Sequence, residues 1–558
     1  MKSMKTASGA FVLASALLLT GCSGGSSDDK GDDSKKTTNT SLQKSYNEQP
    51  ASALKDGGTY TTATTEVSPQ FNPFQQDGTR YTSDVWRWYN PVLKTYSADG
   101  SKVIWNKAYI ERAKSEVKGD KLVVTYTMNP KAKYNDGSPI DWKSFENTWK
   151  ANSGKDKAFL PSSTDGFSAI ESVAKGKDDH EAVITFNQPG VWWEGLFDFL
   201  LNPKVSSADQ FNKFYLNNPH AELGAGPYKI EKYDSKAGTI SFVRNEKWWG
   251  DKGKLDKRTF ITMEASASIN AFKNGQIDST SATTKDRLQQ VKDVPNTELR
   301  RGSYPSNSLL TLNGKSPLLA DKAVRKAIME GVDRSKLAEI EFNGLDYKEE
   351  LPGSFLLFSF QKGYENNVST KFDAEQAKKD LDAAGWKAGS DGVRSKDGKK
   401  LTLSYVNLGD DPVSKAQATA MQAMLKGIGV DMKIDQRASS EFSNVITKKD
   451  FDLFPMGFSS SDPYGVAYAC QVWCSDSGLN QSGVADKSLD PKFKDLTKIG
   501  DKDKQIAEAN KLEKQAMDQY GILPLTNGPV IMATKKGLAN VGASVFYFPF
   551  PETIGWQK

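Results

Sequence analysis

Histidine and cysteine are scarce in this chain, and their scarcity limits the chemistry that it could perform. The 558 residues include two histidines, His180 and His220, and three cysteines. Zinc sites draw mainly on these two residue types, and no His-Glu-x-x-His segment is present. A Ser-His-Asp or Cys-His catalytic arrangement would need one of the two histidines, and neither lies beside a nucleophile signature. We therefore expect no metal site and no histidine-dependent active site.

The first cysteine, Cys22, follows a segment with the pattern of a targeting signal. Lys2 and Lys5 give a positive start, and residues 10–19 form an apolar run. At about 1.5 Å per residue this run covers roughly 15 Å, half of a bilayer core, so it predicts a signal peptide over residues 1–21. The ending Leu-Thr-Gly-Cys resembles a bacterial lipobox, which predicts a lipidated Cys22 on the extracytoplasmic face of the cell membrane. The alternative is an ordinary secretory signal with an incidental cysteine.

A polar segment separates this cysteine from the first strand-like sequence. Residues 22–56 are rich in Ser, Gly, Asp, Lys and Thr, with hardly any apolar side chains. Such a segment buries too little surface to offset its conformational entropy, and we expect a flexible tether. About 33 residues of this kind reach on the order of 30 Å.

The other two cysteines, Cys470 and Cys474, lie four positions apart in Cys-Gln-Val-Trp-Cys. Outside the cytoplasm two spare thiols usually pair, so we predict a local disulfide. A metal site is the weaker interpretation, because two thiolates without a further His or Cys make an incomplete ligand set.

The composition fits a globular protein with a sizeable core. Apolar residues make up 37% and charged residues 26% of the chain, and 74 Lys and Arg against 69 Asp and Glu give a net charge of +5. Repeated apolar runs of about 20 residues are absent, which excludes a polytopic membrane protein. The basic residues are spread evenly, without a basic stripe, so we expect no nucleic-acid partner.

Strand and helix patterns alternate irregularly, which predicts a mixed α/β body. Short β-branched or aromatic runs predict strands, and capping residues predict helix starts at Asp141, Asp373 and Asp411. The expected strands are 122–128, 182–186, 239–243, 260–263, 401–405 and 451–454. A periodic apolar pattern over 506–516 predicts a late helix.

Six blocks of sequence follow one another in an order that we can compare with a known family. They are residues 57–59 with 71–73, 134–139, 224–230 with 244–250, 271–278, 312–313 with 324–334, and 383–386. Together they resemble the extracellular solute-binding proteins of peptide-type ABC importers (solute-binding family 5, the oligopeptide- and dipeptide-binding group). The Gly224-x-Gly226 turn is not a nucleotide loop, because Lys229 stands where a third glycine is required.

The resemblance implies a two-lobed, hinged periplasmic-binding-protein-like α/β fold (type II, cluster C) with an extra small domain. The implied limits are 57–93, 222–303 and 527–558 for the first lobe, 94–221 for the additional domain, and 304–526 for the second lobe. It also implies a monomeric, non-enzymatic receptor without a cofactor, which encloses a peptide ligand and delivers it to the permease subunits of an ABC importer.

The resemblance further implies where ligand would bind. In peptide binders of this family a second-lobe carboxylate holds the α-ammonium of an extended peptide, and the segment 451–463 matches that region. It makes Asp462 the candidate carboxylate, flanked by the backbones of Phe458, Ser459 and Ser460. An aspartate before a proline can also simply make a turn.

Four further candidates are less specific. The first-lobe segment Thr79-Arg80-Tyr81 resembles the part that faces the peptide from the other side, and Arg80 could hold a ligand carboxylate or simply be exposed. Trp473 could line a side-chain pocket or pack in the core.

Other functions stay open at this point. Related binders take oligosaccharides, nickel chelates or haem, and the aromatic residues would suit a sugar. A secreted glycosidase with two catalytic carboxylates needs no histidine, although no feature selects a carboxylate pair. An adhesin or signalling receptor could retain the same fold without transport.

Overall fold

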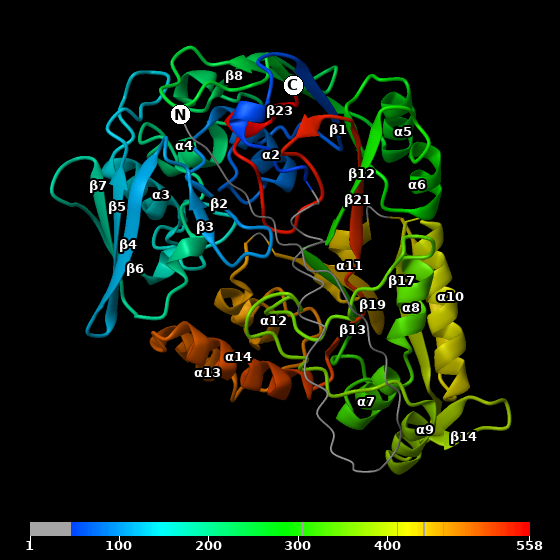
Figure 1. The fold of residues 1–558 in the computed structure, drawn as a ribbon. Helices are drawn as coiled ribbons and strands as arrows, with labels where there is room; N and C mark the ends of the chain where they lie inside the picture. Colours follow the sequence, from blue (N-terminus) through cyan, green and yellow to red (C-terminus); the bar gives the residue numbers. More distant parts are fainter. Residues whose placement is uncertain (1–45, 304, 410, 439–440, 461) are drawn as a thin grey trace, which may run out of the picture.

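The computed structural model describes residues 46–303, 305–409, 411–438, 441–460 and 462–558. The predicted signal peptide and Cys22 lie outside the described residues. Three sheet-based bodies, visible in Figure 1, surround the centre of the molecule. The sheets of the two lobes draw on strands that are far apart in the sequence, whereas the four strands of the third sheet are consecutive.

The first body, here the first lobe, is built on a seven-stranded mixed sheet with the order β12-β21-β11-β1-β10-β9-β8. Strand β1 pairs in parallel with β10, so a segment near the start of the described chain lies beside one 198 residues later. The elements of this lobe are β1 (Thr59–Thr64), α2 (Arg80–Tyr89), β8 (Tyr228–Asp234), β9 (Thr239–Arg244), β10 (Lys257–Thr262), α5 (Ala265–Lys273), β11 (Ser279–Ser281), α6 (Lys285–Val291), β12 (Thr297–Ser303), β21 (Pro529–Lys535), β22 (Leu538–Ala539) and β23 (Gly555–Trp556).

The second body, here the extra domain, is a four-stranded antiparallel sheet packed on one helix. The alternation in Leu-Val-Val-Thr-Tyr-Thr-Met buries every second residue of β5, as a half-buried strand requires. Helix α3 starts at its predicted cap, where the Asp141 carboxylate accepts the Lys143 N–H. The elements are β2 (Lys94–Tyr96), β3 (Val103–Trp105), β4 (Ile110–Lys118), β5 (Lys121–Met128), α3 (Trp142–Asn152), β6 (Ile170–Lys175), β7 (Glu181–Phe186) and α4 (Ala208–Lys213).

The third body, here the second lobe, is a five-stranded mixed sheet with the order β18-β17-β19-β13-β20 and a helical cover. The caps at Asp373 and Asp411 start helices as predicted. The elements are β13 (Ser306–Leu312), α7 (Lys322–Glu330), α8 (Arg334–Glu341), α9 (Ala374–Ala383), β14 (Lys387–Ala388), β15 (Arg394–Lys396), β16 (Lys399–Lys400), β17 (Thr402–Leu408), α10 (Pro412–Gly427), β18 (Asp431–Arg437), α11 (Phe442–Lys448), β19 (Leu453–Ser459), α12 (Ala469–Trp473), α13 (Asp490–Asp495), α14 (Lys502–Met517) and β20 (Ile522–Pro524).

Two short connections join the lobe sheets. Strand β12 of the first lobe is followed at once by β13 of the second, and β20 of the second by β21 of the first. The two connections lie side by side. The side chain of Asn527, in the second connection, donates a hydrogen bond to the carbonyl of Ser306, at the end of the first, at 2.7 Å. Paired crossings of this kind form a hinge. The predicted lobe limits stay predictions, although every strand of the three sheets falls inside the corresponding range.

The predicted flexible tether is wrong for residues 46–56. Leu54 is 1% exposed and bridges to Gln557, and the Tyr46 ring stacks on Tyr547 with centroids 4.4 Å apart. The Asn47 side chain donates to the Leu538 carbonyl. Contacts with the C-terminal segment, about which the local composition carries no information, therefore order this stretch.

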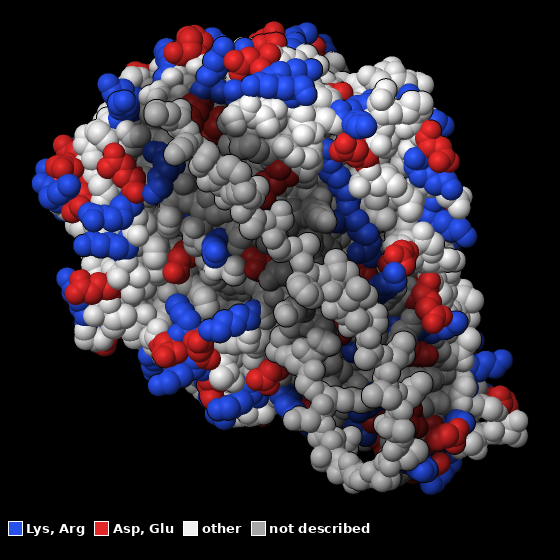
Figure 2. Space-filling view, in the orientation of Figure 1, with Lys and Arg blue, Asp and Glu red and all other residues white. Residues whose placement is uncertain are grey.

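Charges of both signs are interspersed over the periphery of the face drawn in Figure 2. Surface pairs such as Lys362–Asp503 and Lys494–Asp476 are exposed, so they add little to stability.

Candidate functional site

A cavity of about 590 Å³ lies between the second lobe and the extra domain. Four residues that the sequence analysis proposed for ligand binding line it together: Phe458, Ser459, Ser460 and Asp462. The extra domain supplies the facing wall from two segments, 162–167 and 195–198.

Strand β19 positions the residues that form the second-lobe wall of the cavity. It pairs antiparallel with β13, which sets Phe458 opposite Asn307 and Ser459 opposite Ser306. The Ser460 N–H extends the pairing by donating to the Pro305 carbonyl at 2.7 Å. The chain then leaves the sheet edge, so Asp462 stands in a loop directly beyond the strand.

Asp462 is held by two hydrogen bonds from its own loop. The Tyr464 N–H donates to Oδ1 at 2.8 Å, and the Tyr468 hydroxyl donates to Oδ2 at 2.6 Å. The first of these bonds is the turn interaction that the sequence also allowed. Each carboxylate oxygen retains a lone pair, so the turn leaves capacity for a ligand donor.

Burial dominates the electrostatics of this carboxyl. Asp462 is 4% exposed, and desolvation raises its pKa from the ordinary 3.8 to about 6, although both hydrogen bonds act in the opposite direction. Asp198 across the cavity also raises the pKa. A cation placed here would offset both effects.

The other charges of the cavity have the same sign. Asp165 and Asp198 line it with Asp462, and its described lining includes no Lys or Arg. The buried ammonium of Lys94 approaches Asp198 from behind, with 2.5 Å between Nζ and Oδ1. Three carboxylates against one buried lysine leave the cavity with an excess of acidic groups.

Sequence reasoning missed the contribution of the extra domain. Asp198 interrupts the apolar run Leu-Phe-Asp-Phe-Leu, and an acidic residue in such a run is a signal of a buried, partnered charge. Tyr468 and Asp165 carry no comparable signal, because their sequence neighbours give no indication of a buried, partnered side chain.

The structure does not bring the remaining candidates to this cavity. Arg80 and Tyr81 line a separate pocket of the first lobe. Thr79 caps α2 through its side chain and donates to Glu66. Trp473 is 5% exposed and packs with Phe355 in the apolar cluster below the cavity, so it has the core position that the sequence left as one of two alternatives.

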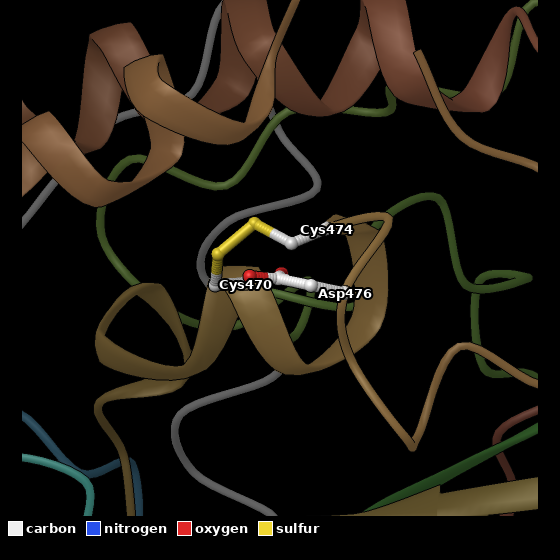
Figure 3. Close-up of side chains that lie close together, drawn as sticks. All are labelled: Cys470, Cys474 and Asp476. Carbon is white, nitrogen blue, oxygen red and sulfur yellow. A yellow bond between two sulfur atoms is a disulfide. The ribbon is translucent and has the colours of Figure 1, made fainter. Parts of the chain in front are cut away.

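A disulfide joins Cys470 of helix α12 to Cys474, the residue directly after that helix, with Cα atoms 4.6 Å apart (Figure 3). Asp476 lies beside the two sulfurs, within 4.8 Å. Sulfurs bonded to each other are not thiolates, so this cluster does not provide a thiolate metal site.

The extra domain and the second lobe are in close contact beside the cavity. The Lys502 ammonium donates to the carbonyls of Gly190 and Val191 at 2.9 and 3.0 Å and lies 4.0 Å from the Trp192 ring centroid. Burial lowers the pKa of Lys502 to about 8. A Cβ on Gly190 would lie 2.3 Å from the Ile499 carbonyl oxygen, so glycine permits this approach.

The fold and the cavity define a class: a hinged, two-lobed binding protein that encloses a small solute. The family model described as bacterial extracellular solute-binding proteins, family 5 (middle part), matches residues 107–480. The chain belongs to this family, as the six sequence blocks predicted. Within the described residues, no helix combines the length and apolar character needed to span a bilayer.

One curated relative and two solved structures are similar to the chain over most of its length. The oligopeptide-binding protein OppA of Mycobacterium tuberculosis is 31% identical over 541 residues, covering 95% of this chain and 90% of the relative. The structure of the periplasmic EDTA-binding protein EppA superimposes with a TM-score of 0.84 at 22% identity, covering 93% of this chain and 99% of that one. The oligopeptide-binding protein AppA of Bacillus subtilis, in complex with a nonapeptide, gives 0.72 at 20% identity, covering 90% and 100%. The two structures show the predicted two-lobed α/β fold.

Proposed function

We propose that this chain is a non-enzymatic receptor that captures oligopeptides between its lobes and delivers them unaltered to the permease of an ABC importer. It acts as a monomer on the extracytoplasmic face of the cell membrane, anchored through lipid on Cys22. No cofactor or metal takes part.

One observation carries the peptide assignment: the buried Asp462 carboxylate, in a cavity lined by further acids. A peptide α-ammonium supplies the cation that this cavity lacks, with donors for the free lone pairs of Asp462. The resemblance to the mycobacterial oligopeptide-binding protein supports the same ligand class. The backbone at Ser459 and Ser460 continues the edge of β19, where an extended peptide could be read through its main chain.

Contacts between the extra domain and the second lobe would form when the protein closes around its ligand. Contacts such as Lys502 with Gly190, and Tyr464 stacked on Trp192 at 5.2 Å, join parts that a hinge motion would separate. Ligand contacts to both sides of the cavity would stabilise the closed form, which the permease would recognise.

The test compares a tripeptide with its N-acetylated form by isothermal titration calorimetry. A charge-assisted hydrogen bond contributes about 1.5–3 kcal/mol, so acetylation should weaken binding about 10- to 100-fold. Asp462→Asn should reduce the affinity for the free peptide by a similar factor. Asp476→Asn is the matched control in the same lobe, because that aspartate is exposed and paired with Lys494. Equal affinity of the wild type for both peptides would contradict the ammonium assignment.

A chelated metal is the second candidate ligand. The resemblance to an EDTA-binding protein and the arginines of the first-lobe pocket favour it. Titration with iron(III)-EDTA separates the candidates: binding of the chelate without binding of peptides would replace the peptide assignment.

A further inference from the structure

A buried carboxylate that the proposed ligand site does not use lies close to the wall of the Asp462 cavity. Glu513, on helix α14, is 0% exposed. The Ser354 hydroxyl donates to its Oε2 at 2.5 Å, and the Phe355 N–H donates to its Oε1 at 2.8 Å. The Asn367 side chain also donates to Oε2, at 2.7 Å. These three partners are neutral groups.

The hydrogen-bond pattern requires an acceptor at both oxygens of Glu513. The Ser354 hydroxyl oxygen accepts the N–H groups of Leu356 and Leu357 at 3.0 and 3.2 Å, so its own hydrogen points to Glu513. The amide and backbone N–H groups of the other two partners can only donate. Burial raises the pKa of Glu513, whereas these hydrogen bonds favour its ionised form. Replacing such a buried polar cluster by apolar groups is often neutral or stabilising, so stability alone does not account for this carboxylate.

The segment that Glu513 holds packs against the loop that contains Asp462. This segment, residues 354–361, is here called the support segment. A Cβ on Gly465 would lie 2.2 Å from the Leu356 carbonyl oxygen, so the two backbones are in direct contact. Glycine at this position of the loop therefore permits the support segment to approach.

The Gln361 side chain is a second link between the support segment and this loop. Its amide nitrogen donates to the Pro463 carbonyl at 2.8 Å, and its oxygen accepts the Phe358 N–H at 2.9 Å. Pro463 directly follows Asp462 in the sequence, and the Tyr464 N–H that donates to Asp462 comes next. The position of Asp462 therefore depends on that of the support segment.

The support segment is also joined to the strand wall of the cavity. Asn307, which lies opposite Phe458 in the β13–β19 pair, donates to the Ser354 carbonyl at 2.9 Å. The Phe355 ring lines the cavity and contacts the Phe458 ring edge-on, with centroids 6.1 Å apart. Because Glu513 binds both Ser354 and Phe355, it fixes the support segment relative to the strand and to the loop at once.

We propose that Glu513 is a positioning residue for the ligand site: its carboxylate holds the support segment in the arrangement that keeps Asp462 in the cavity wall. The proposal rests on the proposed peptide function, because it concerns the carboxylate that receives the ligand ammonium. Glu513 acts through the support segment, since the described lining of the cavity includes Phe355 but not Glu513. A displaced support segment would let the loop turn away, and the ammonium would lose its charge-assisted hydrogen bond.

Glu513→Gln tests the proposal, because glutamine keeps the size of the side chain but brings an N–H group against donors. The dissociation constants of a free tripeptide and its N-acetylated form give a ratio that reports the ammonium contact. Glu513→Gln should lower this ratio about tenfold relative to the wild type, with the acetylated peptide bound as before. Glu508→Gln, on the same helix and paired at the surface with Lys511, is the matched control and should keep the wild-type ratio. An unchanged ratio in Glu513→Gln, or an equal loss of affinity for both peptides, overturns the proposal.

Hydrogen exchange of the ligand-free protein measures the same effect without a peptide. Residues 462–468 should exchange about tenfold faster in Glu513→Gln than in the wild type, whereas β17 (Thr402–Leu408), in the core of the same lobe, should exchange as before. Equal acceleration of both segments would indicate a loss of stability alone and would overturn the proposal. If the wild type binds both peptides equally, the peptide function fails, while the exchange measurement still decides whether Glu513 fixes the Asp462 loop.

Gln361→Met replaces Glu513→Gln if that variant fails to fold. Methionine keeps the length of this half-buried side chain and removes its hydrogen bond to the Pro463 carbonyl. The peptide ratio should fall, and the exchange of residues 462–468 should become faster, as expected for Glu513→Gln. No change in either measurement would overturn the proposal.

Discussion

Replacing Asp462 by asparagine should make the ligand-free protein more stable while it weakens peptide binding. The ordinary carboxyl pKa of 3.8 rises to about 6 in the folded state, because the carboxylate is desolvated. A difference of this size corresponds to about 3 kcal/mol of destabilisation at pH 7.5, where the carboxyl is ionised in both states. Asparagine avoids this penalty, and its amide can bond with both the Tyr464 N–H and the Tyr468 hydroxyl.

The sign of the pH dependence of stability shows whether desolvation of the Asp462 carboxylate causes the difference between the two proteins. A raised pKa means that folded protein binds the proton more tightly than unfolded protein, so wild-type stability falls as the pH rises from 3.8 through about 6. The advantage of Asp462→Asn over the wild type should therefore grow from about 1 kcal/mol at pH 4.5 to about 3 kcal/mol at pH 7.5.

Urea unfolding of both proteins without ligand, at these two pH values, measures the difference. Asp293→Asn, at an exposed position of the first lobe, serves as the control and should change little at either pH. An Asp462→Asn protein that is no more stable than wild type at pH 7.5, or equally stabilised at both pH values, would refute the reasoning.

Three further predictions test the surroundings of the site. Leu54→Ala should lower the free energy of unfolding by about 3 kcal/mol, because a buried leucine of the N-terminal segment is lost; an unchanged urea midpoint would contradict this. The double variant Cys470→Ser with Cys474→Ser should lose about 2 kcal/mol by the loop-entropy model, and wild type in reductant should match it; a loss in neither would show that the bridge adds no stability. Gly190→Ala should hold the extra domain away from the second lobe and enlarge the radius of gyration in X-ray scattering with saturating ligand, whereas an unchanged radius would exclude this contact from closure.

The elements that the sequence predicted are those specified by local signals. Helices begin at Asp141, Asp373 and Asp411 because a side-chain cap acts within three residues of itself. The short strands followed from alternation and β-branched content, and β5 shows the expected burial of every second residue. The family blocks then supplied the order in which the lobes are connected, which no local pattern contains.

Contacts between distant segments account for what the sequence left undecided. The ordering of residues 46–56 depends on a partner strand about 490 residues later, as in the contact of Asn47 with Leu538. The first-lobe pocket combines four arginines on three separate elements, α2, β10 and α6, and nothing in their spacing brings them together. Asp462 was found through the resemblance, whereas the facing Asp198 needed the arrangement of the extra domain.

The crystal structure of the protein with a bound free tripeptide tests the central claim most directly. We expect the peptide nitrogen within hydrogen-bond distance of Asp462 Oδ1 or Oδ2, in an intact ligand enclosed by both lobes. A peptide bound with its N-terminus elsewhere, or a cleaved one, would contradict the account.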